Sequence, residues 1–190
     1  EYHTICCAMS GILFKVEMVE GKERPKELPN DPKNARTTGL LKRLCEGIKG
    51  SGRVVILDSG FCVLEGLVEL RKMGVYASAL IKKRRYWPKH VPGDAIDDHF
   101  KDRNVGDSDS LHGSLNDVKY DFFCMKEPDY TMKIMSTYGG LTVSEGQRNS
   151  KRVFIKNGTE HTTHFKYTEP FANHFDYRHI VDDHNNLRHQ

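Results

Sequence analysis

The chain has 190 residues, of which 37% are hydrophobic and 29% are charged, and its formal net charge is +3. This length fits one principal domain with a substantial core, and a membrane-spanning role is excluded because no apolar run approaches about 18 residues. Five cysteines without a CxxC spacing exclude a disulfide scaffold and a zinc finger. The opening residues lack the pattern of a secretory signal, which predicts an intracellular, reducing compartment.

The first part of the chain predicts an antiparallel hairpin, a loop and a helix. Residues 2–9 and 12–20 are rich in β-favouring side chains and are joined by a tight Ser-Gly turn. Three prolines among the charges of residues 21–35 favour a loop. Leucines and an isoleucine at helical spacing then predict a helix from Thr37 or Thr38 to a stop at Gly50, with an apolar stripe that docks on a sheet.

A strand, a helix and a second strand are expected next. Residues 54–57 are four consecutive apolar residues, the pattern of a strand buried on both faces, and Asp58 follows them directly. Residues 63–73 have the apolar spacing of an amphipathic helix, and residues 75–83 favour a strand. This order predicts a right-handed crossover between two parallel strands.

The rest of the chain predicts short strands and a final helix. The clearest signal is Asn157-Gly158, because this pair supplies the positive φ angles of a type I′ hairpin turn. The segment after Pro170 favours a helix with a mostly polar face. Strands are expected at residues 117–126, 130–138, 141–145, 151–156 and 159–167.

Charge is unevenly distributed between the second expected strand and the later ones. Residues 82–89 carry five basic groups and no acidic one, whereas residues 94–109 hold six aspartates. The basic run mixes cations with Tyr86 and Trp87, so it predicts phosphate binding by charge and stacking on a base or sugar; a solvated strand end is the alternative. The acidic segment, with Asp94, Asp97 and Asp98, favours an exposed loop.

Two aspartates are the candidates for chemistry. Asp58 follows a buried strand, at the rim of the sheet where α/β proteins usually hold ligands, although such a residue is as often only a helix cap or Asx turn. Asp182 lies in the expected final helix, where a solvated face is the alternative. If the fold brings the two carboxylates together, they suit Mg²⁺ and phosphodiester chemistry.

A zinc site and a cysteine nucleophile are disfavoured. His161 and His164 would point to opposite faces of a strand, and no cysteine lies at ligand spacing from them. Cys6 and Cys7, in an apolar strand, are most simply small hydrophobic residues.

The segments HTICCAMSGILFKVEMVEGK, VVILDSGF, ASALIKKRRYWPK and YRHIVDDHNNLRH resemble, in that order, the catalytic core of piggyBac transposases and related transposable-element-derived proteins. The resemblance implies an α/β fold with an RNase H-like mixed sheet flanked by helices and a β-rich insertion before the C-terminal helix. It divides the chain into a catalytic core at 1–116 and 167–190 and a β-meander insertion at 117–166.

The resemblance also implies roles for individual residues. The second and third catalytic aspartates of the family fall on Asp58 and Asp182, which would bind Mg²⁺, two ions in the family. The position that best matches the first aspartate is Cys7, whose thiolate is a poor Mg²⁺ ligand, and Glu17 on the neighbouring strand could supply the missing oxygen. A further family aspartate appears as Asn185. The basic residues that match a DNA-contacting region are Lys82, Lys83, Arg84 and Arg85.

The leading hypothesis is therefore the core of a piggyBac-type DNA transposase, a metal-dependent enzyme for DNA strand cleavage and transfer, degenerate at its first aspartate. The second hypothesis is a catalytically inactive, transposon-derived domain that binds DNA or another protein, and the third is a small α/β binding domain whose aspartates are only caps. The resemblance further implies double-stranded DNA, as transposon ends and target, as the partner, a homodimer, no membrane and a nuclear location.

Overall fold

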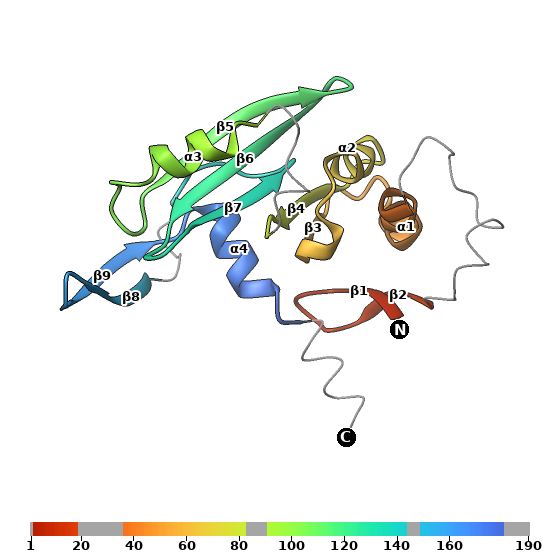
Figure 1. Cartoon of the computed structure of the whole chain (residues 1–190). Helices are drawn as coiled ribbons and strands as arrows, with labels where there is room; N and C mark the ends of the chain where they lie inside the picture. Colours follow the sequence, from red (N-terminus) through yellow and green to blue (C-terminus); the bar gives the residue numbers. More distant parts are fainter. Residues whose placement is uncertain (1, 19–35, 83–90, 144–148, 181–190) are drawn as a thin grey trace.

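The structure is a computed structural model that describes residues 2–18, 36–82, 91–143 and 149–180. Its centre is a mixed sheet of five strands in the order β3-β4-β7-β6-β5, with β3 and β4 parallel and the other neighbours antiparallel (Figure 1). The strands are β3 (Val54–Leu57), β4 (Tyr76–Leu80), β5 (Ser108–Leu115), β6 (Val118–Lys126) and β7 (Thr131–Ser136). Two further pairs form separate ribbons, β1 (Tyr2–Cys6) with β2 (Leu13–Met18) and β8 (Asn149–Lys156) with β9 (Thr159–Lys166).

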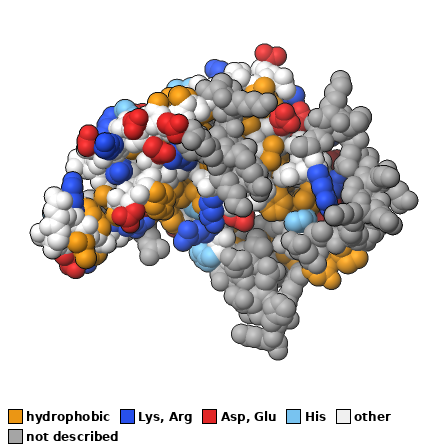
Figure 2. All heavy atoms as spheres, viewed as in Figure 1, with side chains coloured by type: hydrophobic (Ala, Val, Ile, Leu, Met, Phe, Trp, Pro, Cys, Tyr) orange, Lys and Arg blue, Asp and Glu red, His pale blue; other side chains and the backbone are white. Residues whose placement is uncertain are grey.

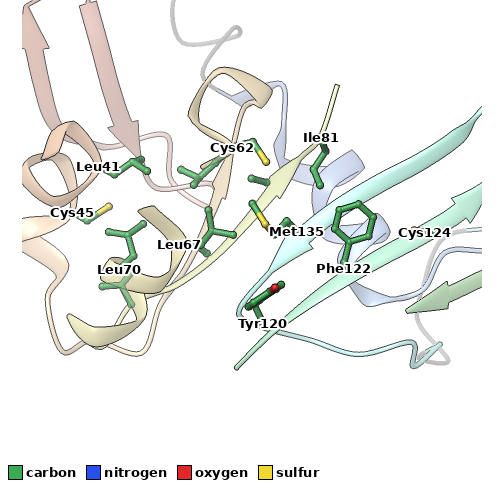
Figure 3. Close-up of a cluster of buried hydrophobic side chains, with 14 of the residues drawn as sticks. Leu41, Cys45, Cys62, Leu67, Leu70, Ile81, Tyr120, Phe122, Cys124 and Met135 are labelled. Atoms are coloured by element: carbon green, nitrogen blue, oxygen red, sulfur yellow. The ribbon is translucent and has the colours of Figure 1, made fainter. Parts of the chain in front are cut away.

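Helices α2 (Leu64–Lys72) and α3 (Gly93–His99) cover one face of the central sheet, and α1 (Arg36–Cys45) packs on α2 and on the β1–β2 ribbon. Leu67 of α2 is fully buried in one cluster with Ala77 of β4 and Phe122 of β6, and Leu41 of α1 joins this cluster from the side of α2 (Figure 3). Short 3-10 helices lie at η2 (Glu46–Ile48) and η3 (Ser59–Phe61). The first apolar helix buries its leucine stripe, as expected, but against α2 and the β1–β2 ribbon rather than directly on the central sheet.

Helix α4 (Glu169–Tyr177) packs on the opposite face of the sheet. Phe171 of α4 is fully buried with Phe123 and Ile134, whereas Phe122, the neighbour of Phe123 in β6, belongs to the core on the other face of the sheet. Alternation along β6 therefore supplies both cores, as the period of two in a strand requires. The result is a layer of helices, a sheet, and a second layer formed by α4 and the adjoining β8–β9 ribbon (Figure 1).

Most elements predicted from local pattern are confirmed. The β3–α2–β4 unit is a parallel pair of strands with a helix between them, and Asn157 and Gly158 have φ angles of 53° and 77° in the β8–β9 turn. The first ribbon also forms, but its turn is longer than a Ser-Gly pair: the Cys7 N–H donates to the Ile12 carbonyl at 2.8 Å, so the turn includes the residues between them.

Two other expectations were wrong at least in part, and one tight turn was missed. The acidic segment is exposed at Asp94, Asp97 and Asp98, as expected, but it is not a loop, because it contains α3 and the start of β5. Asp97 lies 2.6 Å from the Nζ of Lys133, and this salt bridge joins α3 to β7. No strand forms at residues 141–143, the described part of the expected strand at 141–145. The tight β5–β6 turn was missed, because Asn116 and Asp117 adopt positive φ without a glycine.

The strands assigned to the insertion at 117–166 divide between two sheets. β6 and β7 belong to the same sheet as β3 and β4, and β6 pairs along its length with β5, across the expected boundary at 116. Only β8 and β9 form a ribbon of their own. Because the sheet is continuous, strands from the expected catalytic core and from the expected insertion contribute to the same hydrophobic clusters.

Candidate functional site

Asp58 lies at the carboxyl end of β3 and is exposed to solvent. Its Oδ1 accepts a hydrogen bond from the backbone N–H of Ser59 at 2.6 Å, and it caps η3. The capping interpretation is therefore confirmed, but it uses one oxygen: among the described residues, Oδ2 has no hydrogen-bond donor. A capped carboxylate at a sheet rim is held in place with one oxygen directed to solvent or a ligand.

Helix α4 brings a buried histidine close to Asp58. His174 is only 4% exposed, and within the described residues its Nε2 has no hydrogen-bond partner. The pKa of His174 is lowered to about 4, mainly by burial and in addition by the positive charges of Arg178 and Lys82, while the negative charge of Asp58 opposes the shift. The imidazole is therefore neutral at physiological pH, and three charged side chains lie within electrostatic reach of it.

We call Asp58, Lys82, His174 and Arg178 the carboxyl edge. Asp58 follows β3, Lys82 comes two residues after the end of β4, and α4 contacts both strands. Lys82 and Arg178 are exposed, so the edge presents two cations and one carboxylate around a neutral buried ring. Figure 2 shows basic side chains at the position that α4 occupies in Figure 1.

The other residues expected at this edge fall outside the described part of the chain. Asp182, Lys83, Arg84 and Arg85 lie in segments 181–190 and 83–90, and the same is true of Asn185. Of the expected site residues, the structure thus places Asp58 and Lys82 and brings them to a common edge. The participation of the other expected residues stays a prediction.

The β1–β2 ribbon does not place Cys7 or Glu17 beside Asp58. Glu17 forms a two-pronged ion pair with Arg43 of α1, with 3.1 Å between Arg43 Nε and Glu17 Oε2, so its carboxylate faces that helix. At the ends of the ribbon, His3 packs on Phe61 just after Asp58, whereas Phe14 lies under the guanidinium of Arg53, before β3. The two ends of β1 therefore lie near opposite ends of β3.

Cys7 belongs to the end near Arg53. Hydrogen bonds from the Ser10 hydroxyl and from the backbone amides of Ser10 and Met9 lower the pKa of the Cys7 thiol, and the charge of Arg53 acts in the same direction. Residues 53 and 58 are separated by about 16 Å in an extended strand. Neither Cys7 nor Glu17 therefore completes a ligand set with Asp58 in this structure.

The described residues alone do not make a metal centre. They contain no group of three or more His, Cys, Asp or Glu side chains arranged to hold an ion. At the carboxyl edge Asp58 is the only carboxylate among them, so an Mg²⁺ site there needs a second acidic residue such as Asp182. In the same part of the chain, no helix is long and apolar enough to cross a membrane.

A pocket of about 520 Å³ adjoins the carboxyl edge. It lies between α3, the ends of β4 and β7, and α4, and its lining includes Lys82, Asp97, Tyr130, Lys133, Phe175 and Arg178. Lys133 is bound by Asp97 at 2.6 Å and by the Thr131 carbonyl at 3.1 Å, so it is a fixed part of the wall. Lys82 and Arg178 belong both to this pocket and to the edge.

Sequence reasoning missed His174, Arg178 and the pocket. The only signal was the four-residue spacing of His174 and Arg178, which puts both on one side of a helix. That spacing says nothing about which strands the helix contacts. The pocket requires α3, which was interpreted as a loop.

Comparisons with known proteins give two findings. A model of the family described as Transposase IS4 matches residues 1–190. A cryo-EM structure of a piggyBac transposase synaptic complex with hairpin DNA has a similar fold, with a TM-score of 0.69 and 12% sequence identity. The similarity covers 98% of this chain and 33% of the piggyBac chain, so the chain spans about a third of that protein. No curated protein matches significantly.

The structural likeness confirms the expected fold class. The mixed sheet flanked by helices is an RNase H-like fold, as in the piggyBac transposase. At 12% identity this likeness concerns the fold and leaves individual side chains to be argued from their own geometry.

Proposed function

This chain belongs to the Transposase IS4 family, whose model matches all of it, and we propose that it is a transposase core that binds DNA phosphates at the carboxyl edge and cleaves DNA there. The observation that carries the proposal is the meeting of Asp58, Lys82 and Arg178 around His174. Two cations beside a carboxylate at the end of parallel strands suit a phosphodiester whose charge must be neutralised.

In this proposal Lys82 and Arg178 hold phosphate oxygens, and Asp58 and Asp182 hold Mg²⁺. Asp182 lies outside the described residues, two positions after Ile180 in the sequence, so its place at the edge is part of the proposal. Bound Mg²⁺ would stabilise charge on the attacked phosphate. The oxygen of water bonds to phosphorus, the bond from phosphorus to the 3′-oxygen breaks, and a proton lost by the water ends on that oxygen, which leaves as a hydroxyl while the phosphate stays on the 5′-end.

His174 has a positioning role in the same scheme. Because its ring is buried and neutral, it adds no charge to the edge while its packing fixes the face of α4 that carries Arg178. A protonated imidazole there would lie close to Arg178 and Lys82 and would repel both.

A second candidate is a transposon-derived domain that binds DNA without cutting it. The observation in its favour is that neither Cys7 nor Glu17 lies beside Asp58, so the described residues supply one carboxylate where the resemblance implies three. Loss of a carboxylate from a metal-dependent site costs orders of magnitude in rate, whereas binding by Lys82 and Arg178 does not need it.

The test is Mg²⁺-dependent nicking of duplex DNA that carries TTAA, the target that the resemblance to piggyBac transposases implies, with the whole 190-residue chain. The cleavage proposal expects nicking that Asp58→Asn reduces by at least about a hundredfold. Asp117→Asn is the matched control, because Asp117 is an exposed aspartate in the β5–β6 turn, where asparagine tolerates the positive φ. Nicking that Asp58→Asn leaves unchanged would refute the role of Asp58; salt-dependent binding without nicking would favour the second candidate.

A further inference from the structure

We propose that the pocket beside the carboxyl edge binds one unpaired nucleotide of the DNA strand, with its base against Tyr130 and its phosphate on Lys82 and Arg178. This inference rests on the proposed function, since it names the part of the substrate that enters this site. The volume of about 520 Å³ is in the range that encloses a single small-molecule ligand. A base pair with both of its backbones is too large for such a space.

The two aromatic rings that line the pocket, Phe175 and Tyr130, differ in their contacts. Phe175 is stacked on Tyr167, with 4.7 Å between ring centroids, and the guanidinium of Arg178 lies 4.9 Å from the centre of the Phe175 ring. The Phe175 ring is thus already covered by Tyr167 and Arg178, and its contact with Arg178 fixes that guanidinium beside the pocket. Tyr130 is 59% exposed, and within the described residues its ring has no aromatic partner.

An exposed tyrosine ring at the mouth of a pocket is a stacking platform. Stacking on an aromatic side chain is available to every base, but only when the base has left its duplex. The apolar part of the lining, Leu80, Ile81 and Met132, continues the surface on which a base can rest. The ring therefore favours an unpaired base over a paired one.

Charge gives the nucleotide one orientation. The wall from α3 carries the acidic residues Asp94 and Asp97 and offers no cation of its own to a phosphate, while Lys82 and Arg178 lie on the side shared with the carboxyl edge. Lys133, the cation next to this wall, is already bound by Asp97. The phosphate consequently lies next to Asp58 and the base lies deeper between Tyr130 and the apolar lining, so the strand passes from the proposed cleavage position into the pocket.

The experiment compares a duplex that has a short single-stranded overhang with a blunt duplex of the same paired sequence. The overhang carries 2-aminopurine, whose fluorescence falls when the base stacks. We expect the overhang to bind about tenfold more tightly than the blunt end, with quenched fluorescence. Tyr130→Phe should keep this ratio and Tyr130→Leu should bring it close to one, because the ring and not the hydroxyl does the stacking.

Tyr2→Leu is the matched control, since Tyr2 is also 59% exposed but lies in the β1–β2 ribbon. The ratio should not change in this variant, and equal thermal unfolding of all variants shows that folding is unaffected. Equal affinity for overhang and blunt end, or a preference that survives Tyr130→Leu, would overturn the inference and leave duplex binding intact. Absence of salt-dependent binding to either DNA would instead overturn the proposed function.

Discussion

Arg152 and Arg178 both lie over the ring of Phe175, at 5.9 and 4.9 Å from its centre, but their surroundings differ. Arg152 is bound on both prongs by Glu127, at 2.7 and 2.8 Å, and by the Tyr167 hydroxyl at 2.6 Å. Arg178 is exposed, and its described side-chain contact is the ring. Ser150 contacts both Arg152 and Tyr167. We call Arg152, Glu127, Tyr167 and Ser150 the ribbon anchor, because these residues join the β8–β9 ribbon to the central sheet.

The difference separates an arginine that holds structure from one that can hold a ligand. The side chain of Glu127 is only 4% exposed, and its hydrogen bonds are the largest factor that raises the pKa of Arg152. Nε and Nη2 of Arg152 both donate to the carboxylate of Glu127, so the guanidinium needs no anion from outside the protein. Within the described residues the guanidinium of Arg178 has no hydrogen-bond acceptor, so it can bind a ligand at the edge where Asp58 also lies.

The largest expected effect comes from breaking the ribbon anchor. Glu127→Ala leaves the charge of Arg152 partly buried and unpaired, so we expect a loss of about 3 kcal/mol in the free energy of unfolding. Urea unfolding measures it. The matched control is Glu69→Ala, because Glu69 pairs with Lys42 and Lys72 at the surface and should cost less than about 1 kcal/mol. Equal losses in the two variants would mean that the anchor is no more than a surface pair.

The next effect is a pH dependence that originates at the carboxyl edge. The pKa of His174 is lowered from 6.5 to about 4 in the folded chain, so between these values the unfolded chain binds the proton more readily. Its contribution to stability is therefore complete above about pH 6.5 and is lost as the pH falls toward 4. At pH 4.5 the loss is about 2.5 kcal/mol.

The measurement is urea unfolding at a series of pH values for the natural chain and His174→Leu. Leucine fills similar space without the unpartnered Nε2, so the variant should keep its stability at neutral pH and lose less on acidification. Other groups titrate in both proteins, and the difference between the two curves isolates His174. Parallel curves would contradict a neutral, buried imidazole.

How far the sequence predicts these two regions depends on the range of the interactions. The apolar run of β3, the helical spacing of α1 and α2 and the Asn157-Gly158 turn are local signals, and the corresponding elements form. The acidic segment gave the wrong element, because Asp97 is stabilised by Lys133, 36 residues away. No local pattern contains that ion pair.

The candidate site shows the same division. Asp58 could be placed at a sheet rim because its position depends only on where β3 ends. Arg178 could not be placed, since its location depends on which face of the sheet α4 covers. The roles expected for Cys7 and Glu17 required a direction of the β1–β2 ribbon relative to β3, and that direction is set by contacts such as Glu17 with Arg43.

A smaller effect is expected in the salt dependence of DNA binding. Each phosphate contact that is lost lowers the slope of log affinity against log salt by about one, so Lys82→Gln and Arg178→Gln should each do so. Lys119→Gln is the control, because Lys119 is exposed in β6 next to the β5–β6 turn. A slope that changes equally in the control would place the DNA elsewhere on the molecule.

The smallest effect sharpens the comparison of the two arginines, because the same conservative change should act differently at each. Arg178→Lys keeps the charge near phosphate and loses only the contact with the Phe175 ring, so the salt slope should stay the same and DNA affinity should fall by about threefold. Arg152→Lys cannot reproduce the fork that binds Glu127, so it should lower thermal stability. An Arg178→Lys variant that loses stability and keeps its full affinity would mean that Arg178, like Arg152, serves the fold.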